Sequence, residues 1–243
     1  MESAALTEVQ LRNVADLLST WFDRAGRDFP WRFKEDGYLV LATEFLLQRT
    51  RASVANEAYG AFFKRYGTMS KLAGSDKKAL ERFFAPLGLG YRGARLQVIA
   101  RDLKQTHSMK VPCDMNALLE LHGVGVYIAS AVMNFACRIP TPVVDKNVMR
   151  VLNRHFGITR ESAGRELISN LYRYGDSRKI AYALIDLGAL ACLDSRCGCP
   201  LRQVLPVFPL RKGTWRMLRK VIREENQVRL VEQSVHNRYF SKG

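Results

Sequence analysis

The sequence predicts an all-α protein, and three observations lead to this fold class. Apolar residues recur three and four positions apart along most of the chain, which is helical spacing. No segment alternates apolar and polar residues strongly enough to predict a strand. Capping residues, glycines and prolines separate the helical segments. With 243 residues, of which 47% are hydrophobic, the chain can bury a sizeable core as one large or two modest domains.

The first predicted helix runs to about Ala25. Thr7 and Gln10 stand three residues apart and have the form of a capping box, and an apolar stripe follows them. Gly26 ends this helix and opens a loop, residues 27–32, that is rich in aromatic and basic side chains. We interpret Trp31 in this loop as a packing anchor.

A second helix is predicted from Tyr38 to Thr50, and it carries one carboxylate, Glu44, among apolar residues. A carboxylate inside so apolar a helix needs a physical reason. One interpretation is structural: Glu44 pairs with Arg49 or a backbone amide, or faces solvent. The other interpretation is that Glu44 is a functional carboxylate, and the residues alone leave both open.

Further helices are predicted from the same periodicity and from the glycines and serines that interrupt it. They cover residues 54–66, 76–84, 92–103, 162–174 and 179–191. The glycine-rich turn at 88–90 precedes Arg92 and Arg95, which we expect near solvent or phosphate.

A glycine pair separates two further apolar helical segments. Gly123 and Gly125 flank Val124 between them, so the natural shape is two helices joined by a hairpin. Glycine is needed where the backbone takes a positive φ, or where backbone N–H groups must come close to a ligand. Amides at a helix N-terminus suit a phosphate.

An aspartate follows this hairpin at the start of another helix. Pro140 and Pro142 stop the preceding helix, and residues 147–155 have helical spacing up to Gly157. Asp145 therefore lies at or just before a helix N-terminus. The simplest interpretation is an N-cap. A carboxylate held near a phosphate-binding hairpin is nevertheless unusual for simple binding, because it repels the phosphate backbone.

Charge favours a polyanionic partner. The chain has 38 Lys and Arg against 23 Asp and Glu, a net charge of +15. Nucleic acid is the first expectation, and an acidic membrane surface is the alternative. There is neither an apolar run long enough to span a bilayer nor a basic signal region, so we expect a soluble intracellular protein. The 5 unevenly spread cysteines argue against a secreted disulfide framework.

Two motifs together resemble a known family. The pattern Leu-x-Gly-Val-Gly-x-Tyr-x-Ala begins at residue 121, and Val-Asp-x-Asn-Val-x-Arg-Val places Asp145 eighteen residues after Tyr127. This combination resembles the helix-hairpin-helix base-excision DNA glycosylases of the endonuclease III superfamily. Residues 43–50, Thr-Glu-Phe-Leu-Leu-Gln-Arg-Thr, resemble a segment of the adenine and thymine mismatch branches. The resemblance covers roughly residues 14–200.

The resemblance implies two helical lobes with a DNA-binding cleft between them. Residues 36–141 would form a six-helix barrel lobe, and residues 1–35 with 142–243 a second lobe. Asp145 would lie in the cleft. The implied partner is double-stranded DNA with a mismatched or damaged base, and we expect a DNA-associated monomer.

The resemblance also implies roles for individual residues in this hydrolase. Asp145 would stabilise the positive charge that develops on the sugar. Glu44 would hydrogen-bond or protonate the departing base, and Gln48 would fill the space left by the flipped nucleotide. The implied DNA contacts come from Gly123, Val124 and Gly125 in the hairpin and from Arg92 and Arg95.

Tyr127 stands where strand-cutting relatives have a lysine that attacks the sugar. A phenol cannot form the imine, so we predict a monofunctional glycosylase. Thymine or uracil opposite guanine is the preferred substrate, because adenine-removing relatives usually have serine here and usually carry a further C-terminal reader domain. Adenine opposite guanine or oxidised guanine is the alternative. A non-catalytic DNA-structure-binding protein is the alternative of another class.

The family's iron-sulfur loop is only partly kept. Its spacing is Cys-x₆-Cys-x₂-Cys-x₅-Cys; Cys192 and Cys199 fit the first interval, but Arg202 and Phe208 occupy the other ligand positions and Cys197 is out of register. We therefore predict a degenerate loop with no metal and no cofactor.

The remaining cysteines and His236 do not complete a metal site in the sequence. Cys113 and Cys137 are too distant in sequence to supply the missing ligands, and zinc on three cysteines plus His236 would have an unusual spacing. Residues 211–223 predict a basic helix, either a solvated face or a DNA contact.

Overall fold

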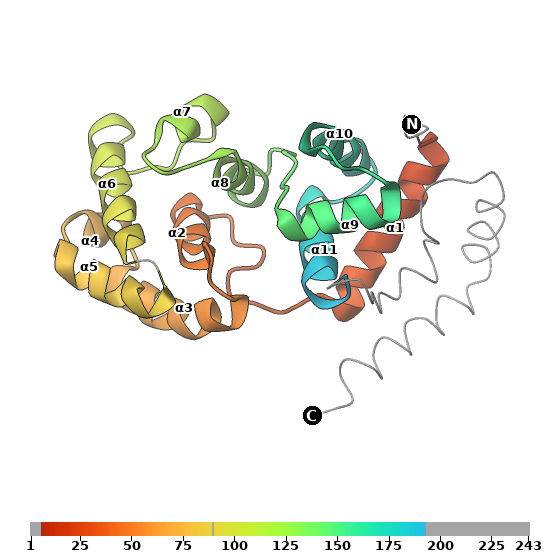
Figure 1. Ribbon diagram of the computed structural model, residues 1–243. Coiled ribbons are helices and arrows are strands. Elements are labelled where there is room, and N and C mark those ends of the chain that lie inside the picture. The colour runs from red at the N-terminus through yellow and green to blue at the C-terminus, as the bar shows by residue number, and fades with distance from the viewer. Residues whose placement is uncertain (1–5, 89, 193–243) are drawn as a thin grey trace. The chain divides into compact units, whose positions relative to one another are not determined.

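The computed structural model describes residues 6–88 and 90–192, and every regular element in these ranges is a helix (Figure 1). The all-α prediction is confirmed for this part of the chain. Contacts divide it into two compact units, unit 1 up to Arg27 and from Pro142 onward, and unit 2 from Asp28 to Thr141. Within the same residues, no helix combines the length and apolarity that crossing a membrane requires.

Unit 1 consists of α1 (Glu8–Ala25), α9 (Lys146–Phe156), α10 (Glu161–Tyr172) and α11 (Ser177–Leu190). The predicted capping box is present at the start of α1, where Thr7 accepts from the backbone of Gln10 and Gln10 accepts from Thr7. The helix α11 packs against both α1 and α9. Most of its apolar residues are buried, so α11 is the central helix of this unit.

Unit 2 is built around α2 (Gly37–Leu47), which packs against α3, α6 and α8. Its other helices are α3 (Ala52–Tyr66), α4 (Met69–Ala73), α5 (Lys77–Phe84), η1 (Ala85–Leu87), α6 (Tyr91–Thr106), α7 (Met115–Glu120), α8 (Val126–Ala131) and η2 (Val132–Ala136). The helix α2 is apolar along nearly its whole length, and Tyr38 and every residue from Val40 to Leu46 are buried. A helix that is apolar all round belongs in the middle of a packed unit.

The predicted helices are confirmed to within a few residues, and the differences are local. The short helices α4 and η1 were not expected, since neither is long enough to show periodicity. The helix after the hairpin continues as a π-helix, η2, in which Cys137 donates to the carbonyl of Val132.

Residues 28–35 were expected to accompany the N-terminal helix, but the contacts group them with unit 2. Trp31 explains this. Its indole is 8% exposed, stacks on Phe29 with ring centroids 4.4 Å apart and lies 5.5 Å from the ring of Tyr59 in α3. The aromatic residues of this loop therefore pack on unit 2, and Trp31 is the packing anchor that the sequence predicted.

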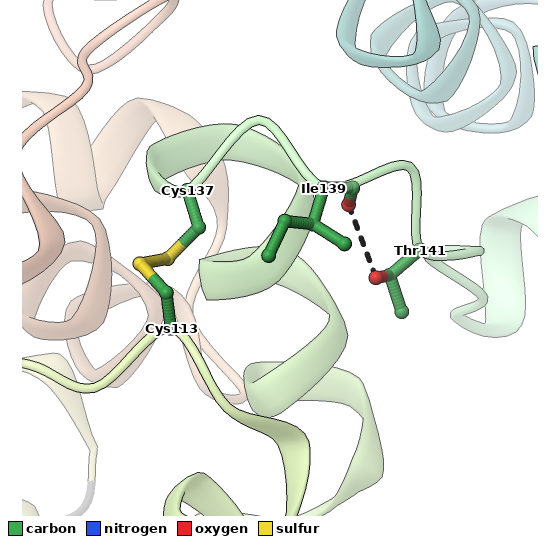
Figure 2. The surroundings of a disulfide bond; sticks show 4 residues. All are labelled: Cys113, Cys137, Ile139 and Thr141. Carbon is green, nitrogen blue, oxygen red and sulfur yellow. Dashed lines mark hydrogen bonds between the residues drawn. A yellow bond between two sulfur atoms is a disulfide. The ribbon is translucent and has the colours of Figure 1, made fainter.

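A disulfide joins Cys113 to Cys137 within unit 2 (Figure 2). It connects the segment before α7 to the end of η2, so the two glycines of the hairpin lie inside the closed loop. Asn134 of η2 donates to the carbonyl of Thr141 at 3.0 Å. Thr141 in turn donates to the carbonyl of Ile139 at 3.1 Å (Figure 2). The sequence did not predict the disulfide, because nothing local marks two cysteines 24 positions apart as neighbours.

Candidate functional site

The glycine hairpin has the predicted shape, but its two glycines serve different needs. Gly123 has φ +82°, which favours glycine, and the backbone N–H of Val124 closes the turn by donating to Leu121 at 3.0 Å. Gly125 is the N-cap of α8 with φ −94°, which any residue adopts, and a Cβ there would meet nothing within 4 Å. The missing side chain at Gly125 leaves the N-terminal amides of α8 open to a ligand.

A basic side chain lies directly against this hairpin. A Cβ placed on Gly123 would be 3.3 Å from Cδ of Arg95. The guanidinium of Arg95 lies over the ring of Tyr91, 4.6 Å from its centroid, and both side chains are exposed. This cation-π contact limits the freedom of the side chain and holds a positive charge beside the open amides.

Glu44 is buried in α2 with only 6% of its surface exposed, so the solvent-face interpretation is wrong. Thr43 beside it donates its hydroxyl to the carbonyl of Leu39 at 2.6 Å. The helix α2 packs on α8, which carries the half-buried Tyr127 in its first turn. Unit 2 thus places a buried carboxylate and a phenol on two packed helices.

Gln48 caps the C-terminus of α2, and the chain turns sharply after it. Arg49 takes φ +53°, a left-handed conformation that is uncommon for a residue with a side chain. Gln48 is half-buried, and its carbonyl accepts from Nη1 of Arg92 at 2.5 Å. The position of the predicted plug is therefore tied to a residue on α6.

The expectation that Arg92 lies near solvent or phosphate is wrong. Its side chain is 0% exposed. The turn after η1 starts α6 against the C-terminal end of α2, so the guanidinium meets backbone carbonyls instead of solvent. Burial also lowers the pKa of Arg92 from its ordinary value.

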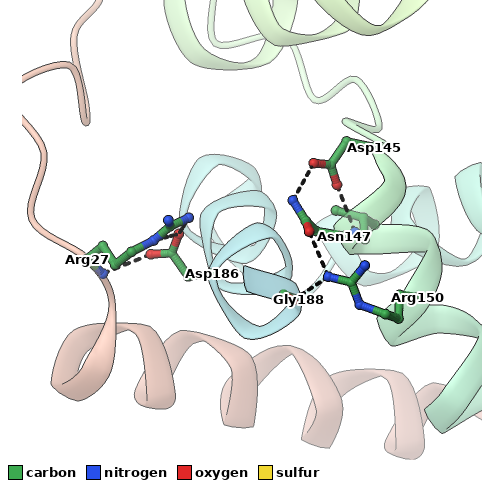
Figure 3. A network of polar contacts seen from close by, with 7 residues as sticks. Arg27, Asp145, Asn147, Arg150, Asp186 and Gly188 are labelled. Carbon is green, nitrogen blue, oxygen red and sulfur yellow. Dashed lines mark hydrogen bonds and ion pairs between the residues drawn. The ribbon is translucent and has the colours of Figure 1, made fainter. Parts of the chain in front are cut away.

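Asp145 is the N-cap of α9, as the sequence predicted (Figure 3). One carboxylate oxygen accepts from the backbone N–H of Val148 at 2.8 Å, and the other accepts from Nδ2 of Asn147 at 2.9 Å. The side chain is half-buried. Each oxygen keeps acceptor capacity, so the carboxylate is fixed in orientation while remaining available to another group.

A series of hydrogen bonds connects Asp145 to α11 through two side chains of α9. Asn147 accepts from Nη2 of Arg150 at 2.7 Å, and the same nitrogen donates to the carbonyl of Gly188 at 2.7 Å. Nε of Arg150 donates to the carbonyl of Cys192 at 2.5 Å. These contacts determine the rotamer of Asn147 and through it the direction of the Asp145 carboxylate.

The helix α11 is itself anchored on its other side. Asp186, which is fully buried, accepts from Nη2 of Arg27 at 2.6 Å and from the backbone N–H of the same residue at 2.8 Å (Figure 3). Gly188 allows α11 to approach α9 so closely that a Cβ would lie 2.5 Å from the carbonyl oxygen of Asn147. Sequence reasoning missed both residues, although a charge inside an apolar helix marked Asp186 as it marked Glu44.

The predicted site residues are divided between the two units. Unit 2 holds Glu44 and Gln48 on α2, Arg92 and Arg95 on α6, and the hairpin with Tyr127; unit 1 holds Asp145.

The thiols that the structure describes do not fit a cluster held by four cysteines. Cys192 is buried, and its sulfur lies 3.4 Å from Nη1 of Arg154. Cys113 and Cys137 are paired with each other. Among residues 6–88 and 90–192 there is no group of three or more His, Cys, Asp or Glu side chains that could hold a metal ion. The absence of a cofactor stays a prediction.

Several residues of the sequence analysis lie outside the described part of the chain. They are Cys197, Cys199, Arg202, Phe208, the segment 211–223 and His236.

The chain is similar to a known protein family and to several characterised proteins. Residues 42–173 match the model of the HhH-GPD superfamily base excision DNA repair protein. The chain is 34% identical to the thymine/uracil-DNA glycosylase of Methanothermobacter thermautotrophicus, over 76% of this chain and 87% of the relative. It is 35% identical to the adenine DNA glycosylase of Mycolicibacterium smegmatis, over 76% of this chain and 66% of the relative.

Solved structures of DNA glycosylases have the same fold as this chain. A thermostable thymine-DNA glycosylase superposes with a TM-score of 0.73 at 32% identity, over 79% of this chain and 92% of that one. A non-covalent endonuclease III–DNA complex superposes with a TM-score of 0.68 at 22% identity, over 88% and 99% of the two chains, which shows the shared fold. The resemblance seen in the sequence is thereby confirmed, and the chain belongs to the HhH-GPD superfamily of base excision DNA repair proteins.

Proposed function

We propose that this protein is a monofunctional DNA glycosylase that hydrolyses the N-glycosidic bond of a mismatched base, thymine or uracil opposite guanine. The observation that carries the proposal is Asp145, a carboxylate fixed by the N-terminus of α9 and by Asn147. Breaking an N-glycosidic bond builds positive charge on the sugar, and a pre-oriented carboxylate stabilises that charge without having to reorganise. Asp145 also orients or deprotonates the attacking water.

The departing base needs a proton or a hydrogen bond, and Glu44 is the residue that we assign to this role. Its carboxyl group is 6% exposed on the apolar helix α2. A carboxyl group held on a packed helix is fixed in position, and we propose that it hydrogen-bonds or protonates the base as the N-glycosidic bond breaks.

DNA binding is assigned to the hairpin and its neighbours. The amides of Val126 and Tyr127 start α8 beside Gly125, and Arg95 is held against Gly123 by Tyr91. A helix N-terminus and a guanidinium both favour a phosphate oxygen. The net charge of +15 adds a long-range attraction to the duplex. A base must leave the stack to be hydrolysed, and Gln48 is the side chain that we propose to fill the vacated space.

Tyr127 supports a monofunctional enzyme. A strand-cutting glycosylase requires an amine that attacks the sugar and forms an imine. The phenol of Tyr127 cannot do this, so the product is an intact abasic site. We further propose that the protein acts as a monomer.

The choice of base rests on Tyr127 and on the named relatives. Relatives named thymine/uracil-DNA or thymine-DNA glycosylase are 29–34% identical to this chain and are covered over 87–90% of their length. We propose that the half-buried phenol of Tyr127 favours a smaller pyrimidine ring over a purine. Adenine opposite guanine or oxidised guanine is the second candidate, because relatives named adenine DNA glycosylase reach 35% identity.

A panel of duplexes with single defined mismatches tests both candidates. Each duplex is incubated with the protein and then treated with alkali, which breaks the strand at an abasic site. We expect thymine or uracil release opposite guanine, with strand breaks only after alkali. Adenine release without pyrimidine release would support the second candidate, and no release from any duplex would favour a non-catalytic DNA-binding protein. A strand break without alkali, with an adduct trapped by borohydride, would contradict the monofunctional assignment.

A further inference from the structure

Arg92 is fully buried in unit 2, so its guanidinium serves the protein interior and not a DNA contact. Nη1 of Arg92 donates to the carbonyls of Phe45 at 2.8 Å, Leu46 at 3.1 Å and Gln48 at 2.5 Å. These carbonyls belong to the last turn of α2 and its C-cap. The last carbonyls of a helix have no intrahelical partner, and Arg92 supplies their donor from another helix.

The second nitrogen of the same guanidinium ties this turn to the last residue of η1. Nη2 donates to the hydroxyl of Thr50 at 3.1 Å and to the carbonyl of Leu87 at 2.8 Å. Thr50 in turn donates to the carbonyl of Leu87 at 3.0 Å. The planar fork of arginine can hold both segments at once, which an ammonium group at a single point could not.

The turn that Arg92 holds is not one that the backbone adopts readily. Arg49, between Gln48 and Thr50, takes φ +53°, although it carries a side chain. A strained backbone of this kind persists only where surrounding contacts maintain it, and such residues occur often at functional sites. Arg92 bonds to Gln48 and Thr50, the neighbours of Arg49 on each side.

We propose that Arg92 is a positioning residue, which holds the turn after α2 so that Gln48 is presented in the conformation that fills the space of the extruded nucleotide. Arg92 does not touch DNA; it acts through Gln48. The inference rests on the proposed function, because it assumes that Gln48 enters the duplex.

The first test measures the turn itself and needs no activity. Hydrogen-deuterium exchange of the peptide covering residues 46–51 is compared between wild type and Arg92→Met. Arg101→Met is the matched control, because Arg101 lies on the same helix and also donates to a backbone carbonyl, that of Ala73 at 3.1 Å. We expect exchange in residues 46–51 to be at least about tenfold faster in Arg92→Met and unchanged in Arg101→Met.

The second test separates positioning from general damage. Single-turnover release of uracil is measured from a duplex with uracil opposite guanine and from one with uracil opposite a tetrahydrofuran abasic analogue, where no base pair resists extrusion. We expect Arg92→Met to slow release about tenfold or more opposite guanine, and markedly less opposite the abasic analogue. A merely structural loss of folded protein would reduce both rates by the same factor.

Milder variants keep the proposal testable if Arg92→Met does not fold. Arg92→Lys keeps the charge but not the fork, and Thr50→Val removes the hydroxyl while leaving Arg92 in place. Both should show the same change in exchange and rate to a smaller degree. Wild-type exchange and an equal effect on both duplexes in these variants would overturn the proposal. If the wild type releases no uracil from either duplex, the proposed substrate fails, while the exchange experiment still decides whether Arg92 holds the turn.

Discussion

Asp145 is the side chain that we propose to stabilise the sugar cation. We predict that Asp145→Asn lowers base release by at least about a hundredfold, because it removes the charge that stabilises the sugar cation. Duplex binding should stay within a few-fold, since asparagine caps a helix about as well as aspartate. Single-turnover rates and binding titrations measure the two effects.

Asp176→Asn is the matched control for this variant. Asp176 also caps a helix, accepting from the backbone of Arg178 and Lys179 at the start of α11, but it is exposed. Release at the wild-type rate is expected in the control. Full activity in Asp145→Asn would rule out the proposed mechanism.

Gly188 provides a second test at the level of one residue. Replacing a glycine in a helix by alanine normally stabilises the protein, but a Cβ at Gly188 would lie 2.5 Å from the backbone oxygen of Asn147. We predict that Gly188→Ala destabilises the fold by about 1–3 kcal/mol, as overpacking does, and slows base release by moving the start of α9.

Gly60→Ala is the comparison for that prediction, because a Cβ on Gly60 in α3 would meet nothing within 4 Å. It should stabilise the protein by about 0.5–1 kcal/mol in urea denaturation and leave the rate unchanged. Equal stability changes in the two variants would mean that α11 and α9 can separate without cost.

The disulfide governs the stability of an entire segment, the one that contains α7, the hairpin and α8. It closes a loop with a sequence separation of 24 residues. By the chain-entropy model such a closure stabilises by about 3 kcal/mol, so reduction should lower the free energy of unfolding by up to this amount. Urea denaturation with and without a phosphine reductant measures the difference.

A double variant distinguishes the disulfide from other thiol effects. Cys113→Ser with Cys137→Ser should reproduce the reduced protein and no longer respond to the reductant. Cys192, a buried cysteine that is not part of this disulfide, should make no difference to this comparison when changed to alanine in both forms. A response to reductant that persists in the double variant would contradict the prediction.

Charge acts through the molecule as a whole. With a net charge of +15, DNA binding should weaken steeply with salt, because each neutralised phosphate contributes a slope of about −0.9 in log K against log salt concentration. Arg95→Ala should reduce the magnitude of the slope by about 1, since Arg95 lies beside the hairpin. A flat salt response would contradict the basic DNA-binding surface.

The cofactor content is also a property of the whole chain. We predict that the purified protein is colourless and contains no stoichiometric iron, because Arg202 and Phe208 occupy two ligand positions of the family's cluster loop. Visible absorption and metal analysis measure this. One cluster per chain would show that other residues supply the missing ligands.

Local features of this protein could be predicted from its sequence. The helices, the capping box at Thr7, the hairpin at Gly123 and the N-cap at Asp145 depend on residues within a few positions of each other. Their physical causes are backbone hydrogen bonds, side-chain caps and the conformational freedom of glycine, all of which act over one helical turn. The motif spacing from Tyr127 to Asp145 then led to the family.

The environment of each side chain depended on contacts between distant segments and could not be predicted in this way. Arginine is ordinarily a surface residue. Arg92 is nevertheless buried, because its guanidinium donates to carbonyls at the C-terminal end of α2. Gly188 matters because α9 lies against it, and Cys113 meets Cys137 because the fold of α7, α8 and η2 brings the two ends of that segment together. The burial of a side chain, the close approach of two helices and the pairing of two cysteines all depend on which surfaces meet in the folded protein. The periodicity of the sequence shows which face of a helix is apolar, but not which other segment will cover it.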